Sequence, residues 1–301
     1  MNKDKWDLVL PQLLLNENAK YMIWGKLMLR RMADSGIFNV EYRKFPPKLF
    51  ALTRPGHMTP FILNGKKCFL DDWDYSYPTS SISEEFFERN PEHKDLKYVF
   101  KIQYSRGEIP FFTKLGEKFG IQIFPFFMFP RHDFELASWK WKNGDHKYLA
   151  LFSGRVWKFR RQWNAYMQKH PECISVNDSY LKVTDKRMNA IDDDVYLDIL
   201  KQTKWGLCLR GKGTDCKNRR EVEYLSYGMP LVLDYKPYYP FDDEFQPNKD
   251  YVYLEKPEDL EKLKDMDPEY FSERSTYLYK RYFDPDVLGL ALIEKFGHLF
   301  P

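Results

Sequence analysis

Basic residues and glycines gather in one short segment of the 301-residue chain, between Trp205 and Asp234. The apolar run 205–209 predicts a buried strand, and the loop after it leads into a helix predicted over 218–227. Loop amides, a helix N-terminus and guanidinium groups together form the chemistry that binds phosphate. The residues that would supply it are Arg210, Gly211, Lys212, Gly213, Arg219 and Arg220. The segment therefore predicts a phosphate site. The alternative is a solvated basic face, on which one of the two adjacent arginines would pair with Glu221 at the surface.

Two acidic residues of the same segment suit the sugar of a nucleotide. Asp215 lies in the loop, and Glu223 follows eight positions later on the predicted helix. A carboxylate there can accept hydrogen bonds from both ribose hydroxyls. Glu223 could instead be an intrahelical partner of Arg219. Downstream aromatic residues could stack on a base or pack at the sheet edge, and we expect packing for at least two of them: Tyr235, Tyr238 and Tyr239.

The segment resembles the donor-binding region of GT-B glycosyltransferases. In that pattern two acidic residues separated by seven others precede a Gly-x-Pro and a hydrophobic strand, as do Asp215, Glu223, Gly228 and Pro230 here. Within that superfamily the chain is most similar to the exostosin-like glycosyltransferases, through CLRGKG, the order Arg-Arg-x-x-Glu and the later YYPFDDEF. Upstream, ALFSGRVWKFR resembles their element of strand, glycine and basic residue.

Three features depart from the exostosin pattern. Asp215 stands where Glu is usual, Met-Pro-Leu replaces Cys-Ile-Pro, and we find no membrane anchor. The last difference argues against the Golgi setting of animal exostosins and favours glycan assembly by a virus-encoded or bacterial enzyme. The protein O-glucosyltransferase-like group, also GT-B, is a related alternative.

The resemblance implies an inverting, metal-independent glycosyltransferase. A hexosyl or pentosyl group would pass from a UDP-linked donor to a hydroxyl of an oligosaccharide or glycoprotein acceptor, with no cofactor besides the nucleotide sugar. Lys and Arg would stabilise the departing diphosphate. The donor-binding residues would be Gly154, Arg155, Arg210, Gly211, Lys212, Gly213, Asp215, Arg219, Arg220 and Glu223.

Inversion by direct displacement needs a base near the acceptor hydroxyl, and we expect it in the first half of the chain. The candidates are Asp74, Asp72 and His57, followed by His132 and Asp133. Asp72 and Asp74 also match the Asp-x-Asp metal motif of GT-A enzymes. They follow a predicted hairpin rather than a nucleotide-binding strand and helix, so we expect no metal site there.

The order of predicted elements indicates an α/β protein with two halves. The first half has expected strands at 48–53, 98–104 and 121–129, a helix at 109–119, and a hairpin at 60–71 that turns at Asn64 and Gly65. The second half alternates strands at 148–153, 172–176, 205–209, 229–234 and 251–254 with helices at 155–169, 193–202, 218–227 and 257–263, before two terminal helices at 268–299 that break near Pro285. We expect a GT-B fold with two Rossmann-like lobes facing a central cleft: an acceptor-binding lobe over 1–140, and a nucleotide-sugar-binding lobe with the C-terminal helices over 141–301.

Composition narrows the class of protein. With 43% hydrophobic and 30% charged residues the chain is an ordinary globular one, and a net charge of +3 argues against a nucleic-acid partner. The four cysteines show neither a CxxC pair nor zinc spacing. The amino terminus is a poor secretion signal, so we expect a soluble cytoplasmic protein without an integral membrane segment. A non-catalytic glycan-binding module that keeps the fold is the alternative from another class.

Overall fold

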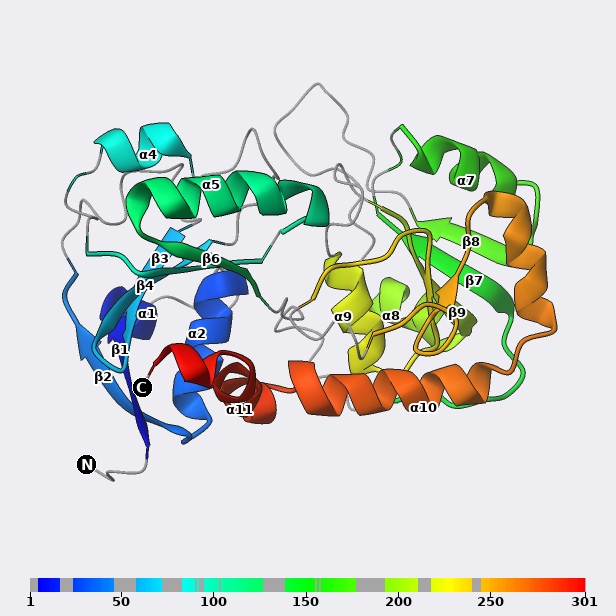
Figure 1. Cartoon of the computed structure of the whole chain (residues 1–301). Coiled ribbons are helices and arrows are strands. Elements are labelled where there is room, and N and C mark those ends of the chain that lie inside the picture. Colours follow the sequence, from blue (N-terminus) through cyan, green and yellow to red (C-terminus); the bar gives the residue numbers. More distant parts are fainter. Residues whose placement is uncertain are drawn as a thin grey trace, which may run out of the picture.

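The computed structural model describes residues 5–16, 24–45, 58–71, 83–89, 91, 95–102, 104–126, 139–154, 156, 158–176, 193–210, 218–239 and 245–300. Two β-sheets, one from each half of the chain, form its centre (Figure 1). The prediction of an α/β protein is therefore confirmed. The strand expected at 48–53 lies outside the described residues.

The first sheet has the order β2-β1-β3-β4-β5-β6. Its strands are β1 (Trp6–Pro11), β2 (Phe38–Arg43), β3 (Met58–Leu63), β4 (Lys66–Asp71), β5 (Tyr98–Lys101) and β6 (Gln122–Pro125). Among these strands only β3 runs against the others, because it pairs antiparallel with both β1 and β4. The hairpin prediction is confirmed: Asn64 and Gly65 both have positive φ, at 44° and 76°. The sheet is therefore mainly parallel.

Helices cover both faces of this sheet. On one face, α4 (Glu84–Arg89) and α5 (Ile109–Phe119) bury Phe69 and Val99, and α5 has the bounds that the sequence predicted. On the other face, α2 (Trp24–Asp34) contributes Met28 and Met32 to a core that contains Phe100. The short α1 (Leu13–Asn16) and the 3-10 helix η3 (Arg106–Glu108) complete the described part of this half. The elements β1, α1, α2, β2 and α4 were not predicted.

The second sheet is entirely parallel, with the order β11-β10-β9-β7-β8. Its strands are β7 (Tyr148–Ser153), β8 (Cys173–Val176), β9 (Thr203–Cys208), β10 (Leu231–Leu233) and β11 (Val252–Tyr253). All five were predicted, each within a few residues. If these five strands are numbered 1 to 5 in sequence order, starting with β7, their order in the sheet is 2-1-3-4-5, which is an order found in doubly wound sheets.

Successive residues of these strands point to opposite faces, and each face has its own helices. Phe152 packs with α7 (Arg160–Met167) and the 3-10 helix η5 (Pro257–Lys264), whereas Leu151 packs with α8 (Asp193–Lys201) and α9 (Arg219–Ser226).

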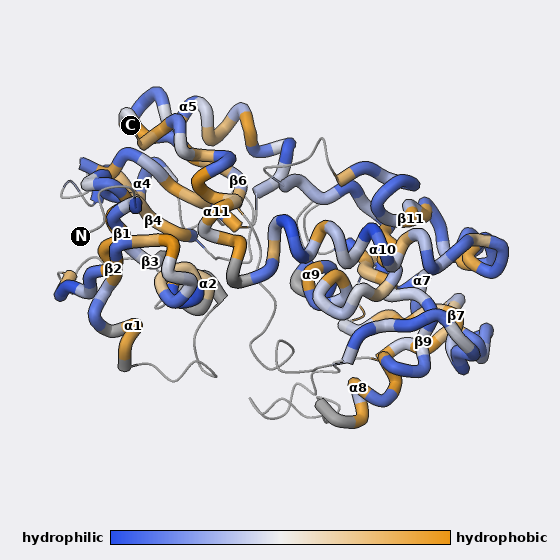
Figure 2. The backbone as a smooth tube through the Cα atoms, turned by 90° about the horizontal axis from the view of Figure 1, so that it is seen from below, coloured by the Kyte–Doolittle hydropathy of each residue, from blue (hydrophilic) through white to orange (hydrophobic). Residues whose placement is uncertain are grey.

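The last helices connect the two sheets. α10 (Pro268–Leu278) packs on α9, a π-helical turn η6 (Tyr279–Phe283) follows, and α11 (Pro285–Phe296) packs on α2 of the first half, ahead of η7 (Gly297–Leu299) (Figures 1 and 2). The ring centroids of Phe296 and Phe100 lie 5.2 Å apart. Two terminal helices with a break near Pro285 were predicted. The domain division remains a prediction, although α11 lies with the first sheet.

Gly206 allows α9 to pack directly on β9. A Cβ atom at this position would lie 2.5 Å from the ring of Tyr224, which is fully buried. We expect Gly206→Ala to lower the free energy of unfolding by about 1–3 kcal/mol, as overpacking does in other cores. Urea unfolding measures the loss. Gly107→Ala is the control, because a Cβ there meets nothing nearer than 3.6 Å, and an equal loss in both variants would contradict the prediction.

Candidate functional site

The carboxyl ends of the second sheet's strands carry the polar residues of the candidate site. Its winding reverses between β7 and β9, and open parallel sheets bind ligands at such a point, outside the carboxyl ends. β7 ends at Ser153 and is followed by Gly154, while β9 ends at Cys208 and is followed by Leu209 and Arg210. The fold therefore brings two segments that were predicted to bind a donor to neighbouring strand ends.

Arg160, the first residue of α7, joins these two strand ends. Its Nη2 donates to the carbonyl oxygen of Leu209 at 2.6 Å, and its Nε donates to that of Arg210 at 2.9 Å. The guanidinium is buried over the ring of Phe152. Gly154 has φ 155°, and a Cβ atom there would lie 3.4 Å from Nη1 of Arg160. Burial lowers the pKa of Arg160, which stays charged.

Arg210 is fixed by a buried carboxylate at the end of β10. The backbone N–H of Arg210 donates to Oδ1 of Asp234 at 2.5 Å, and its Nε donates to Oδ2 at 3.0 Å. The Asp234 side chain is 1% exposed and that of Arg210 is 30% exposed. Burial raises the pKa of Asp234, and the bonds from Arg210 oppose that rise. The guanidinium of Arg210 thus lies at the surface and is held in place by the buried carboxylate of Asp234.

The start of α9 is built by a capping box. The Asn218 side chain accepts from the N–H of Arg220 at 3.1 Å, and Glu221 accepts in return from the N–H of Asn218. Glu221 is fully buried and also accepts from the hydroxyls of Tyr235 and Tyr239. The suggestion that Glu221 pairs with an arginine on the surface is therefore wrong. The packing expected for two of the tyrosines is confirmed.

Arg220 and Glu223 form an ion pair inside α9. Nη1 of Arg220 lies 2.6 Å from both Oε1 and Oε2 of Glu223, and its guanidinium lies 4.7 Å from the ring centroid of Tyr196. The Glu223 side chain is 1% exposed and that of Arg220 is 12% exposed. Burial lowers the pKa of Arg220, but the charge of the Glu223 carboxylate outweighs burial and raises that pKa overall. Glu223 thus pairs with Arg220, while the side chain of Arg219, the partner that the sequence suggested, is not among the described ones.

Other predicted site residues lie outside the described part of the chain. These are Arg155, Gly211, Lys212, Gly213, Asp215, His57, Asp72, Asp74, His132 and Asp133, and also the side chain of Arg219. Their roles remain predictions. The structure places Gly154 and Arg210 around Arg160, and α9, which carries Arg220 and Glu223, begins beside the same strand end, where Nδ2 of Asn218 donates to the carbonyl oxygen of Leu209 at 3.4 Å. It adds Arg160 and Asp234, which sequence reasoning missed.

A buried ion pair marks the carboxyl edge of the first sheet. Nζ of Lys101, at the end of β5, lies 3.0 Å from Oδ2 of Asp71, at the end of β4, and both side chains are fully buried. Asp71 immediately precedes the candidate base Asp72. Nearby, the guanidinium of Arg106 lies 4.8 Å from the ring of Tyr238, so segments after β5 and β10 are in contact.

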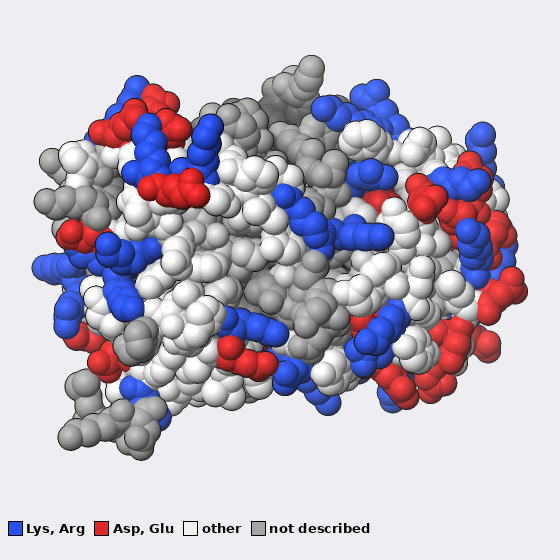
Figure 3. All heavy atoms as spheres, in the orientation of Figure 1, with Lys and Arg blue, Asp and Glu red and all other residues white. Residues whose placement is uncertain are grey.

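Charged groups elsewhere are interspersed. Figure 3 shows acidic and basic side chains beside one another in small groups on one face. Among the described residues, one group could hold a metal ion: His170, Glu172 and Glu261. Nζ of Lys264 already lies 3.2 Å from Glu172 and 2.5 Å from Glu261. Glu172 precedes β8, so this group lies at the amino edge of the sheet, away from Arg210.

No protein-family model matches the sequence, and no curated protein matches it. Similar solved structures include a mutant of S. aureus TarM in complex with Fondaparinux, alpha-GlcNAc-glycerol and UDP, at 14% identity and a TM-score of 0.41 over 76% of this chain and 48% of that one. The GtfA/B complex is similar at 11% identity and a TM-score of 0.39 over 75% and 50%. The chain spans about half the length of each. None of the described helices has the length and apolar character needed to cross a membrane.

Proposed function

We propose that the protein is an inverting, metal-independent glycosyltransferase of the GT-B type, similar to the exostosins. It transfers a sugar from a UDP-linked donor to a hydroxyl of a glycan. The observation that carries this proposal is the cluster of Arg160, Arg210, Arg220 and Glu223 at the carboxyl edge of a doubly wound parallel sheet. Such an edge is where this architecture binds nucleotides.

The arginines have the chemistry that a departing diphosphate needs. Arg210 presents a guanidinium at the surface while Asp234 holds its backbone and Nε. Arg220 lies in the first turn of α9, whose N-cap Asn218 donates to the carbonyl oxygen of Leu209, and Arg160 donates to the carbonyl oxygens of Leu209 and Arg210. Fixed cations stabilise developing negative charge without reorganising when the bond to the sugar breaks. They would do the work that a metal ion does in other transferases.

Glu223 is the proposed acceptor for the ribose hydroxyls. Its carboxylate has about four lone-pair positions, and Arg220 uses two of them in this structure. Donor binding would draw Arg220 from Glu223 towards the diphosphate and open the carboxylate to the pentose. The ion pair between Arg220 and Glu223 would thereby be replaced by two contacts with the donor, one from Arg220 to the diphosphate and one from Glu223 to the pentose.

The acceptor is proposed to bind the first half of the chain, with Asp74, Asp72 or His57 as the base. The contact between Arg106 and Tyr238 supports an arrangement in which the carboxyl edges of the two sheets face one another. The base would take the proton of the acceptor hydroxyl as its oxygen attacks the anomeric carbon and the diphosphate leaves from the opposite face.

A screen of nucleotide sugars tests the proposal. We expect titration calorimetry to detect UDP binding, and release of UDP from one UDP-sugar when a glycan acceptor is added. Binding of UDP without turnover of any donor would favour the non-catalytic glycan-binding module. No binding of any nucleoside diphosphate by the folded protein would overturn the donor site itself.

Arg160 is expected to act as a positioning residue for this site. Arg160→Met removes two charge-assisted hydrogen bonds to the strand end that carries Arg210, so the affinity for UDP should fall about tenfold. Arg160→Lys keeps the charge but not the fork geometry and should recover only part of the affinity. Calorimetry on folded variants measures both values. Unchanged UDP affinity in Arg160→Met would contradict the role.

A further inference from the structure

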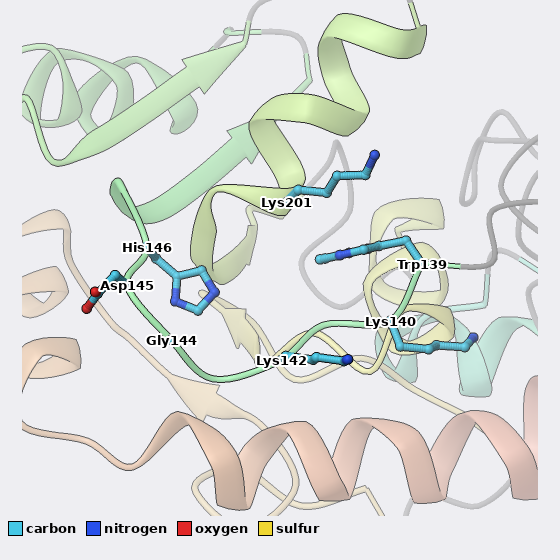
Figure 4. Close-up of a pocket in the computed structure, with 7 residues that line it drawn as sticks. All are labelled: Trp139, Lys140, Lys142, Gly144, Asp145, His146 and Lys201. Atoms are coloured by element: carbon cyan, nitrogen blue, oxygen red, sulfur yellow. The ribbon is translucent and has the colours of Figure 1, made fainter.

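A polar hollow lies at the edge of the second sheet opposite to the candidate donor site (Figure 4). Its volume is about 580 Å³, and it is lined by residues of the segment 139–146 and by Lys201. His146 lies just before β7, and Lys201 ends α8 just before β9, so the hollow is at the amino ends of these strands. Since β9 has six residues at about 3.3 Å each, the hollow is about 20 Å from the edge that carries Arg210.

The segment 139–146 is firmly attached to the protein. The N–H of Trp141 donates to the carbonyl oxygen of Tyr227 at 2.8 Å, and its indole Nε1 donates to that of Thr203 at 3.3 Å. Nζ of Lys140 donates to the carbonyl oxygen of Ser226 at 2.6 Å. Trp141 is buried. These bonds fix the wall of the hollow to the end of α9 and the start of β9, so the hollow is formed before any ligand arrives.

Two rings face one another across the hollow. Figure 4 shows the indole of Trp139 and the imidazole of His146 directed towards each other from the two ends of the segment, while Asp145 points away. His146 is held in place by stacking on Trp141, with ring centroids 5.4 Å apart and an angle of 6° between the planes. Burial lowers the pKa of His146, so the ring is neutral near pH 7 and can both donate and accept. A flat amphipathic ring such as Trp139 suits a sugar face.

Positive charge surrounds these rings. Lys142 is exposed and has no ion-pair partner in the described part of the chain. The Nζ atom of Lys201 lies 3.9 Å from Oδ1 of Asp198, which is a long distance for an ion pair. Lys140 has two further donors besides the one that Ser226 accepts. With Asp145 turned outward, the hollow therefore offers ammonium groups and no facing carboxylate among the residues that line it.

We propose that this hollow binds an anionic saccharide, one that carries carboxylate, sulfate or phosphate groups. Trp139 would pack on a sugar ring, and Lys142, Lys201 and Lys140 would bind its charged groups. The binding itself is independent of the proposed glycosyltransferase activity. If that activity is correct, the hollow anchors an acceptor chain about 20 Å from the point of transfer, a distance set by the length of β9.

The test compares oligogalacturonate, which has a carboxylate on every ring, a chondroitin sulfate oligosaccharide, and neutral maltooligosaccharide of matched length. The test variants are Lys142→Glu with Lys201→Glu, and separately Trp139→Ala. The control is Lys114→Glu with Lys169→Glu, two exposed lysines on α5 and after α7 that change the net charge equally. Titration calorimetry at low and moderate salt gives the affinities.

We expect both anionic probes to bind and the neutral one not to. Charge reversal should weaken binding at least about tenfold, since it removes two ion pairs and adds repulsion, and the control should stay within about twofold. Trp139→Ala should weaken the binding of the anionic saccharides but not the binding of inorganic phosphate. Equal loss in the control, equal binding of the neutral probe, or tighter binding of a single-stranded oligonucleotide would each overturn the proposal.

The same variants separate this proposal from the donor site. UDP affinity should be unchanged in Lys142→Glu with Lys201→Glu. In an active enzyme the double variant Lys142→Glu with Lys201→Glu should have a higher KM for a long anionic acceptor, while kcat and the KM for the donor stay the same. Saccharide binding without any UDP binding would contradict the proposed glycosyltransferase function but support the saccharide site. UDP turnover without saccharide binding would support the proposed function but contradict the saccharide site.

Discussion

Glu223→Gln is expected to weaken UDP binding by about thirtyfold to a hundredfold. The glutamine keeps the size of the side chain but loses the charge that strengthens two hydrogen bonds from the ribose, each worth about 1.5–3 kcal/mol when one partner is ionised. It keeps one acceptor oxygen, so part of the binding survives. Calorimetry with UDP on the folded variant measures the change.

A comparison of ligands shows whether Glu223 acts on the ribose or only on Arg220. Inorganic pyrophosphate has no pentose, so Glu223→Gln should not weaken its binding, while Arg220→Met should weaken both pyrophosphate and UDP. Glu273→Gln, at an exposed position of α10, is the matched control. Equal weakening of both ligands by Glu223→Gln would mean that Glu223 merely holds Arg220, and the ribose assignment would be lost.

The second half of the fold could be predicted from the sequence because its strands are buried on both faces. Strands of that kind are continuous apolar runs, and the run at 148–153 has the bounds of β7. β1 was missed because Asp7 and Pro11 interrupt its apolar pattern, yet Leu8 and Val9 pair with β2 on one side and β3 on the other. Those partners are distant in the sequence, so the pairing that makes this segment a strand has no local signal.

The candidate site shows the same limit. The spacing of Arg220 and Glu223 put both on one helix, but only the packing of α9 decides that they pair under Tyr196. Glu221 stands between them and was expected at the surface, whereas Tyr235 and Tyr239 bury it from 14 and 18 positions away. Arg160 ends the element ALFSGRVWKFR, but it precedes Arg210 by 50 positions, and nothing in the sequence indicated that the two segments meet. Sequence patterns indicate which residues share an element; tertiary packing decides which of them face the ligand.

Lys101→Met is expected to lower the free energy of unfolding by about 3–5 kcal/mol, the usual cost of leaving one member of a buried ion pair behind. Asp71 would lose this ammonium partner at the carboxyl edge of the first sheet, where both side chains are fully buried. Urea unfolding followed by the far-UV signal measures the loss. Lys118→Met is the control, because its ion pairs with Glu84 and Glu88 are exposed and should contribute only a small part of that value.

The double variant Asp71→Leu with Lys101→Met separates the charge from the packing. Removing both charges leaves neither member of the ion pair behind, so stability should return to within about 1–2 kcal/mol of the original protein. A double variant that is less stable than Lys101→Met would show that the ion pair itself stabilises the sheet. Because Asp71 directly precedes Asp72, a stable double variant also provides a test of catalysis. If the pair fixes the chain that leads to the candidate bases, this variant should lose kcat while its affinity for UDP stays unchanged.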